Sequence, residues 1–298
     1  MKLITFINQE GKKKAGWVEG NNVFDLHEVS NGELPDNVLD LIKGYERYLP
    51  KLQKLEGKST PLDEINLTTP LSNPPSVRDF IAFEEHMLNA GKRVGLPPVP
   101  EWYEIPVFYF TNHLALRGPN DEVERPPSCK LLDYELEMAC VIGKEGKNIK
   151  AEEAEEYIFG YTILNDWSAR DLQSKEMKVG LGPAKGKDFA NSIGPYIVTK
   201  DELEAYRIGD RFDLSMTASV NGKMLSEGNF KDIYYSFGQM IERASEGVTL
   251  YPGEIIGSGT VGRGCLLEFG PEVHRWLEAG DMVELEVEGL GKLRNTVV

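Results

Sequence analysis

The segment YELEMACVIG at residues 134–143, followed by YIFGYTILND at residues 157–166, indicates the fold class of this chain. Both are short runs rich in apolar, β-branched and aromatic residues, as β-strands are. Similar segments predict strands at residues 194–199, 213–228, 253–262, 265–270 and 281–293. The second of these contains Asn221-Gly222, a type I′ hairpin signal. Many short strands with few helices predict a β-rich α+β fold.

The N-terminal part predicts a smaller unit. LITFIN, AGWVEG and VFDLHE, within the first thirty residues, are expected to form hairpins. Apolar residues at helical spacing predict one helix over residues 38–52, and residues 58–75 are rich in Pro, Ser and Thr. We expect a small N-terminal β-rich domain and linker at residues 1–72 and a larger domain at 73–298. Helices are also expected at residues 79–90 and 233–247.

The composition disfavours several classes of protein. The formal net charge is −15 over 298 residues, so we expect no nucleic-acid partner, because phosphate binding requires clustered Lys and Arg. No apolar run approaches the ~18 residues that span a bilayer, and Met1 starts a strand-like segment without the features of a secretion signal. We therefore expect a cytoplasmic protein without a membrane partner. The three cysteines form no CxxC pair and are expected to be reduced structural thiols.

Carboxylates mark a candidate metal site. On a strand, Glu135 and Glu137 share one face while Leu136 and Met138 occupy the other. Taken alone, such a pair is more often a solvated acidic surface. The next predicted strand, however, ends at Asp166, which offers a third oxygen donor. Carboxylates without neighbouring His or Cys favour Mg²⁺ or Mn²⁺, with Ca²⁺ as a further candidate and Zn²⁺ less suited.

A possible acid–base pair and a cationic segment accompany these carboxylates. Asp79 and His86 are seven residues apart, which on the predicted helix would place them on one face. His86 is a candidate general base, although a lone histidine on a helix is more often structural. Arg170, Gln173 and Lys187 lie in a segment with several glycines. This segment is interpreted either as a loop that closes over a carboxylate substrate or as a solvated surface loop.

The glycine pattern at residues 257–262 matches GxGxxG but does not predict a nucleotide site. A dinucleotide fingerprint must open a helix in a βαβ unit. Here the sequence continues as GRGCLLEFG, which is expected to be strand.

These motifs resemble those of the fumarylacetoacetate hydrolase family. The resemblance is carried by ExE at residues 135–137, by NDWSARDLQ at 165–173 and by GKDF at 186–189, and it covers about residues 73–298. It implies a mixed β-sandwich roll as the catalytic domain and, commonly for the family, a homodimer. The N-terminal unit is smaller than that of the aromatic-catabolic hydrolases of this family.

The resemblance also implies roles for individual residues. The metal ligands would be Glu135, Glu137 and Asp166, with Asp79 as a fourth carboxylate. His86 would be the general base and Glu268 the acid that orients it. The remaining site residues would contact substrate oxygens or stabilise developing charge: Lys187, Arg170, Gln173, Tyr109 and Thr260.

The activity implied by the resemblance is metal-dependent hydrolysis of a carbon–carbon bond in a β-diketo acid, such as fumarylacetoacetate or an acylpyruvate. Three alternatives share the metal site. They are a decarboxylase or isomerase of an oxo-diacid such as oxaloacetate or a hydroxymuconate, a sugar-acid dehydratase, and a carboxylate-binding protein without catalysis. The small-molecule partner expected in each case is an organic acid, usually an oxo-acid.

Overall fold

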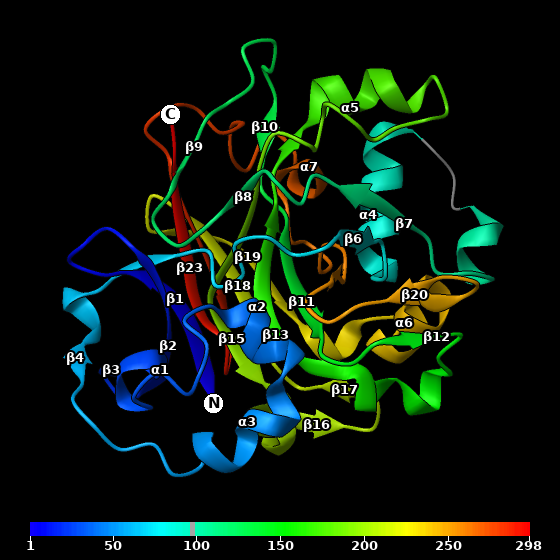
Figure 1. Cartoon of the computed structure of the whole chain (residues 1–298). Coiled ribbons are helices and arrows are strands. Elements are labelled where there is room, and N and C mark those ends of the chain that lie inside the picture. Colours follow the sequence, from blue (N-terminus) through cyan, green and yellow to red (C-terminus); the bar gives the residue numbers. More distant parts are fainter. Residues whose placement is uncertain (96–98) are drawn as a thin grey trace.

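The computed structural model describes residues 1–95 and 99–298 (Figure 1). Its framework is a strand-rich mixture of sheets and helices, which confirms the expected fold class. The large sheet runs in the order β4-β3-β2-β1-β15-β13-β11-β21-β6-β7, with β5 beside β1 and β8 beside β15. Along that path the strands are Thr60–Pro61, Asn22–Asp25, Lys13–Glu19, Lys2–Ile7, Asn191–Thr199, Ile158–Asp166, Leu136–Ile142, Ile255–Gly257, Val77–Phe80 and Phe108–Thr111, with β5 at Asn66–Thr68 and β8 at Leu116–Arg117.

A second sheet runs in the order β19-β18-β22-β23-β9, with strands Lys223–Asn229, Ser215–Val220, Met282–Val287, Gly291–Val297 and Glu122–Val123. Three two-stranded ladders pair β10 (Leu132–Asp133) with β14 (Ser168–Ala169), β12 (Gly146–Lys147) with β20 (Thr249–Leu250), and β16 (Arg207–Ile208) with β17 (Arg211–Phe212). The α-helices are α1 Leu26–Val29, α2 Val38–Lys43, α3 Tyr45–Leu52, α4 Glu84–Val94, α5 Arg170–Met177, α6 Phe237–Ser245 and α7 Leu266–Phe269. Short 3-10 helices are η1 Leu62–Glu64, η2 Pro100–Tyr103, η3 Ala151–Tyr157, η4 Lys200–Tyr206 and η5 Phe230–Asp232.

The centre of the large sheet is buried on both faces. Along β11, Met138 and Cys140 belong to a core shared with Leu285 of the second sheet. The alternate residues Ala139 and Val141 belong to a core shared with α2 and other N-terminal elements. Because successive side chains of a strand point to opposite faces, one strand serves two cores. This explains why β11 is apolar throughout its length except at Glu137.

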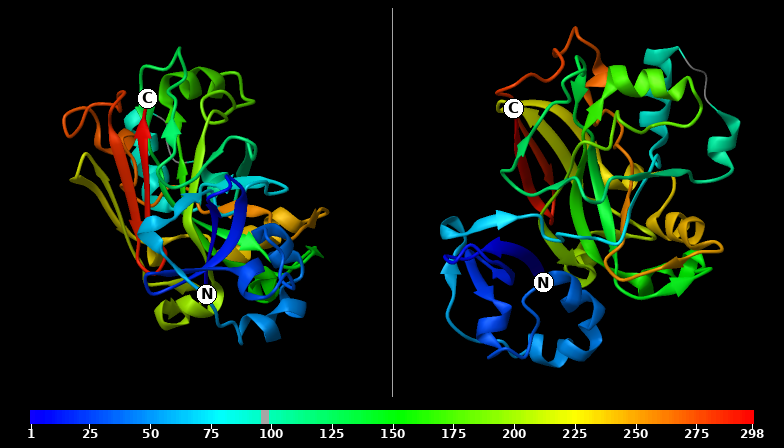
Figure 2. Two further views of the ribbon diagram at one scale, coloured as in Figure 1. Left: turned by 60° about the vertical axis from the view of Figure 1, so that its left-hand side comes forward. Right: turned by 45° about the horizontal axis from the view of Figure 1, so that its top comes forward.

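The N-terminal unit contains the predicted hairpin strands and is joined to the large sheet. β1 pairs antiparallel with β15, with Lys2 opposite Val198. The stretch predicted as linker contains β4 and β5, which pair with β3 and β1. In the right-hand view of Figure 2 these first residues, in blue, form one side of the molecule. Among the described residues, no helix combines the length and apolar character needed to cross a membrane.

Several local predictions were wrong. Residues 77–80 are strand β6, and the helix begins only at Glu84, because pairing of β6 with β21 and β7 overrides the local helical spacing. The helix predicted over residues 38–52 is interrupted at Gly44, which divides it into α2 and α3. The segment 265–270 is not a strand but contains α7, a single turn followed by Gly270 with φ 82°. Apolar runs this short do not distinguish the two structures by periodicity.

Other predictions are confirmed. The hairpin of β18 and β19 turns at Asn221 and Gly222, whose φ angles are 51° and 78°, as a type I′ turn requires. Helix α6 lies within the predicted 233–247. The cationic segment, in contrast, was predicted to be a loop, but its first part is helix α5, which begins at Arg170 directly after β14.

Candidate active site

Four buried carboxylates from three strands of the large sheet and a neighbouring position converge at one point. Asp79 comes from β6, Glu137 from β11, Asp166 from the end of β13, and Glu135 directly precedes β11. One oxygen from each lies within 4.8 Å of the others. The sheet order explains this, because β6, β21, β11 and β13 are successive neighbours. Asp79 therefore belongs to the cluster, but from a strand and not from a helix.

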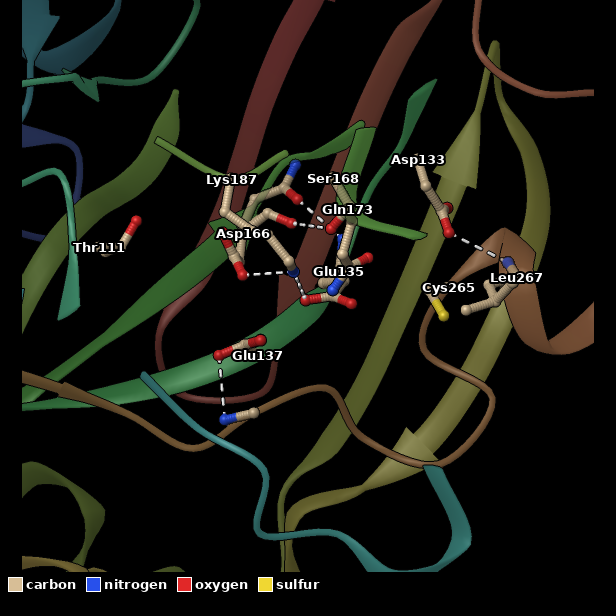
Figure 3. Close-up of polar contacts among 12 residues, drawn as sticks. Thr111, Asp133, Glu135, Glu137, Asp166, Ser168, Gln173, Lys187, Cys265 and Leu267 are labelled. Atoms are coloured by element: carbon tan, nitrogen blue, oxygen red, sulfur yellow. Dashed lines mark hydrogen bonds and ion pairs between the residues drawn. The ribbon is translucent and has the colours of Figure 1, made fainter. Parts of the chain in front are cut away.

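Strand alternation positions Glu135 and Glu137 as the sequence suggested. Leu136 and Met138 enter the core between the sheets, so the two glutamates face the other way. The amide of Glu135 donates to Asn165 Oδ1 at 3.0 Å, which fixes the chain beside the end of β13. Figure 3 shows Glu135, Glu137 and Asp166 directed into a common space.

Three oxygens of this cluster lack protein donors. Asp79 Oδ1, Glu137 Oε1 and Asp166 Oδ1 are buried without a hydrogen-bond partner. Burial raises the pKa of Glu137 well above its usual value, and the carboxylates of Asp79 and Glu135 add to the effect. Burial and Asp166 likewise raise the pKa of Asp79. Unpartnered buried carboxylates are costly, and an all-oxygen donor set suits a hard cation. This buried acidic cluster could hold a metal ion.

Lys187 lies against two of these carboxylates. Its Nζ is 2.5 Å from Glu135 Oε2 and 2.5 Å from Asp166 Oδ2 (Figure 3). Its side chain is buried. Burial alone would lower the pKa of Lys187, but Asp166 and Glu135 raise it above the ordinary value, so the amine is an ammonium. Burial would also raise the pKa of Glu135, yet Lys187 and Arg170 hold it below its usual value. The ammonium of Lys187 is therefore an internal cation of the cluster.

The other residues expected to contact substrate lie around this cluster. The guanidinium of Arg170 is 2.8 Å from Glu135 Oε1 and donates to Asp133, so in this structure it faces protein carboxylates. Gln173 accepts from Arg170 at 3.2 Å. Tyr109, on β7, donates to Asp166 Oδ2 at 2.5 Å. Thr260 is buried in the loop after β21. Their contacts with substrate stay predictions.

His86 and Glu268 form a second buried group. His86 Nδ1 is 2.8 Å from Glu268 Oε1. Glu268 also accepts from Asn89 Nδ2 at 3.0 Å and from the amide of Arg263 at 2.8 Å. Burial alone would raise the pKa of Glu268, but these donors lower it below its usual value. Cys265 is close to this pair, yet the oxygens of Glu268 are already satisfied, which disfavours a second metal site here.

The glycine-rich loop after β21 touches both groups. The segment 253–262 was predicted to be strand throughout, but only Ile255–Gly257 is strand. The amide of Gly259 donates to Glu137 Oε2 at 3.0 Å, and the amide of Gly264 donates to Glu268 Oε1 at 3.2 Å. A side chain at Gly257 would collide with Asp79. The pattern that resembled a nucleotide fingerprint therefore reflects close packing of backbone against carboxylates.

Sequence reasoning missed two participants, Gly259 and Asp133. Gly259 was noted only as part of the rejected nucleotide motif. Asp133 is fully buried and accepts from Arg170 and from the amides of Leu266 and Leu267. Its position two residues before Glu135 was the only local signal, because its partners come from distant parts of the chain.

The strand-rich fold holds a buried carboxylate cluster beside a buried His–Glu pair, an arrangement that is typical of an enzyme active site. The family model for the fumarylacetoacetate (FAA) hydrolase C-terminal region matches residues 76–298. The chain belongs to the fumarylacetoacetate hydrolase family.

Members of this family with different activities are similar to the chain. The mitochondrial oxaloacetate tautomerase Fahd2a of Rattus norvegicus is 32% identical over 94% of this chain and 85% of its own length. The 2,4-didehydro-3-deoxy-L-rhamnonate hydrolase of a Sphingomonas species is 31% identical over 100% of this chain and 96% of its own. The solved structure of a fumarylacetoacetate hydrolase from Exiguobacterium antarcticum aligns with a TM-score of 0.77 and 27% identity over 100% of this chain and 99% of that one. These relatives include tautomerases and hydrolases.

Proposed function

We propose that this chain is a divalent-metal-dependent hydrolase that cleaves a carbon–carbon bond of a β-diketo acid of the acylpyruvate or fumarylacetoacetate type. The observation that carries the proposal is the buried His86–Glu268 pair, which one glycine-rich loop holds beside the carboxylate cluster. Hydrolysis needs a base that deprotonates water and a site for the metal ion that polarises the substrate. In this proposal the His–Glu pair provides the base and the carboxylate cluster provides the metal site.

Asp79, Glu135, Glu137 and Asp166 would hold the cation, for which Mg²⁺ or Mn²⁺ is proposed and Ca²⁺ is a further candidate. When bound, the cation would supply Lewis acidity toward the oxo and carboxylate oxygens of the substrate. His86, oriented by Glu268, would take a proton from water, whose oxygen attacks the carbonyl carbon. The carbon–carbon bond then breaks, and its electron pair leaves on the enolate of the oxo-acid. His86 returns the proton to the carbon of that enolate.

Lys187 has the charge to assist this reaction. Its ammonium lies in the carboxylate cluster and is buried, where a cation stabilises developing negative charge more strongly than in water. Gln173 is half-buried next to Arg170 and is proposed to bind a substrate oxygen. Arg170 is proposed to act mainly by holding Glu135, because its guanidinium is already engaged with protein carboxylates.

The test is turnover of a defined substrate. The purified chain, loaded with Mg²⁺ or Mn²⁺, is incubated with a series of acylpyruvates, and pyruvate is measured with a coupled assay. We expect pyruvate and the matching carboxylic acid in equal amounts, and loss of turnover on chelation that Mn²⁺ restores. Absence of pyruvate from every acylpyruvate, together with absence of fumarate and acetoacetate from fumarylacetoacetate, would reject the proposal.

Oxaloacetate tautomerisation is the second candidate, favoured by the similarity to Fahd2a. A tautomerase moves one proton between carbon and oxygen and breaks no carbon–carbon bond. The two activities are therefore distinguished by their products. Faster decay of the enol absorbance of oxaloacetate without pyruvate release would favour the tautomerase, whereas pyruvate release from acylpyruvates would favour the hydrolase.

A further inference from the structure

Asp133 lies outside the carboxylate cluster but is bound from two sides. It belongs to β10, which pairs with β14 so that Asp133 is opposite Ser168. Its side chain is fully buried. On one side, Oδ2 accepts from Nε of Arg170 at 2.8 Å. On the other, the amide of Leu266 donates to Oδ1 at 2.8 Å and the amide of Leu267 to Oδ2 at 3.0 Å.

The partners of Asp133 are connected to the two groups of the candidate site, the carboxylate cluster and the His86–Glu268 pair. Arg170 reaches from Asp133 to Glu135, 2.8 Å from its Oε1. Leu266 and Leu267 open α7, and the next residue of that one-turn helix is Glu268, which contacts His86. Figure 3 shows Asp133 directed at Leu267, on the side of the site away from Glu137. A single carboxylate is therefore linked by hydrogen bonds both to a residue that holds a metal-ligand candidate and to the helix that carries the partner of the candidate base.

We propose that Asp133 is a positioning residue that fixes Glu135, through Arg170, and His86, through α7 and Glu268, relative to each other. The role rests on the proposed function, in which both groups act on one substrate. Hydrogen bonds to an ionised acceptor are about twice as strong as neutral ones, and a helix of one turn has little intrinsic stability to hold Glu268 by itself. The carboxylate of Asp133 restrains Arg170 on one side and the start of α7 on the other.

The chain contains a matched control for this residue. Asp281 is also a buried carboxylate that accepts from an arginine and a backbone amide, namely Arg275 Nη1 at 2.6 Å and the amide of Glu278 at 2.8 Å. It precedes β22 of the second sheet and has no contact with the carboxylate cluster among its partners. If the role of Asp133 were purely structural, Asp133→Asn and Asp281→Asn would have the same effect on kcat.

The first experiment compares these two variants. Both are expected to lower the melting temperature, but only Asp133→Asn is expected to lower kcat, by about 10- to 100-fold, with KM changed less than about 3-fold. Asp281→Asn should keep kcat within about 2-fold of wild type. Equal kcat in the two variants would overturn the proposal, as would an effect of Asp133→Asn confined to KM.

A double-mutant cycle tests the path through Glu268. If Asp133 acts by orienting Glu268, the losses in kcat from Asp133→Asn and Glu268→Gln will be strongly non-additive. Additive losses would overturn this half of the proposal. Should Asp133→Asn not fold, Asp133→Glu replaces it in the cycle, because the longer side chain keeps the charge but moves the carboxylate relative to the amides of Leu266 and Leu267.

A spectroscopic readout is independent of turnover. The chain has only four histidines, so the ¹⁵N and downfield proton signals of the His86 ring are assignable by comparison with His86→Gln. We expect these signals to shift in Asp133→Asn and in Arg170→Lys and to stay unchanged in Asp281→Asn. Unshifted signals in folded Asp133→Asn would overturn the proposal. If wild type turns over no acylpyruvate, the proposed function fails, while the shift of the His86 signals still decides the role of Asp133.

Discussion

The backbone amide of Gly259 donates a hydrogen bond of 3.0 Å to Glu137 Oε2. This contact joins the glycine-rich loop after β21 to the acidic cluster. Gly259 has φ 76°, and a Cβ there would collide with the carbonyl of Phe80. The loop can therefore pack against the backbone at Phe80, in the position from which Gly259 reaches Glu137, only where a side chain is absent.

Gly259→Ala is expected to weaken Mn²⁺ binding by at least about 10-fold, because the loop must withdraw and Glu137 loses a donor that fixes its orientation. The matched control is Gly222→Ala in the hairpin turn, where φ is 78° and a Cβ would meet nothing within 4 Å. The control carries the same backbone strain of about 1–2 kcal/mol. Isothermal titration with Mn²⁺ checks the difference, and equal affinities in the two variants would contradict the expectation.

Glu137→Gln is expected to stabilise the metal-free protein and to remove its response to metal. Glu137 is fully buried, and its pKa is raised by burial and by Asp79. Replacing this carboxylate with an amide relieves repulsion among the buried carboxylates worth about 1 kcal/mol. It also removes one of the negative charges proposed to bind the metal ion. Thermal unfolding with and without Mn²⁺ is the measurement. Wild type should gain about 2.7 kcal/mol at a hundredfold excess over Kd and the variant far less, whereas exposed Glu227→Gln should behave as wild type.

The two strands that carry Glu137 and Asp166 were predictable because their signals are local. Alternation around Glu135 and Glu137, and the apolar run ending at Asp166, are visible within ten residues. The family motifs placed His86 and Glu268 in one site, and the structure has them 2.8 Å apart. The type I′ turn at Asn221 followed from two residues alone.

What could not be predicted depends on distant partners. Asp79 appeared helical because its neighbours have helical spacing, yet its strand pairs with β21, in which Gly257 lies opposite Asp79. The segment containing Glu268 appeared to be a strand because α7 is one turn long. The only local signal for Asp133 was its position two residues before Glu135, because its partners are Arg170 and two amides beyond residue 265.

His86→Ala is expected to lower kcat for an acylpyruvate by about 10²- to 10⁴-fold, the usual contribution of a general base. Mn²⁺ affinity should stay within about 3-fold, because His86 contacts Glu268 and not the acidic cluster. Steady-state kinetics with parallel calorimetry check both expectations. His27→Gln is the control, since that ring hydrogen-bonds to the carbonyl of Leu34 in the N-terminal unit. Unchanged kcat in His86→Ala would remove the histidine from the mechanism.

Asp281→Asn is expected to lower the free energy of unfolding at pH 7 by about 1.5–3 kcal/mol, the range for a hydrogen-bonded buried charge. Burial alone would raise the pKa of Asp281, but donors from Arg275, Glu278 and Asn221 lower it to about 2.

Because the folded pKa lies below the unfolded value of about 3.9, the stabilisation by Asp281 is complete above about pH 4 and is lost as the pH falls through about 2. Urea unfolding of both proteins between pH 7 and pH 2.5 is the measurement. The difference between wild type and variant should be constant down to about pH 4.5 and should then shrink. Exposed Asp210→Asn should show neither effect. A difference that persists undiminished at pH 2.5 would mean that the packing of Asp281, and not its charge, holds the turn before β22.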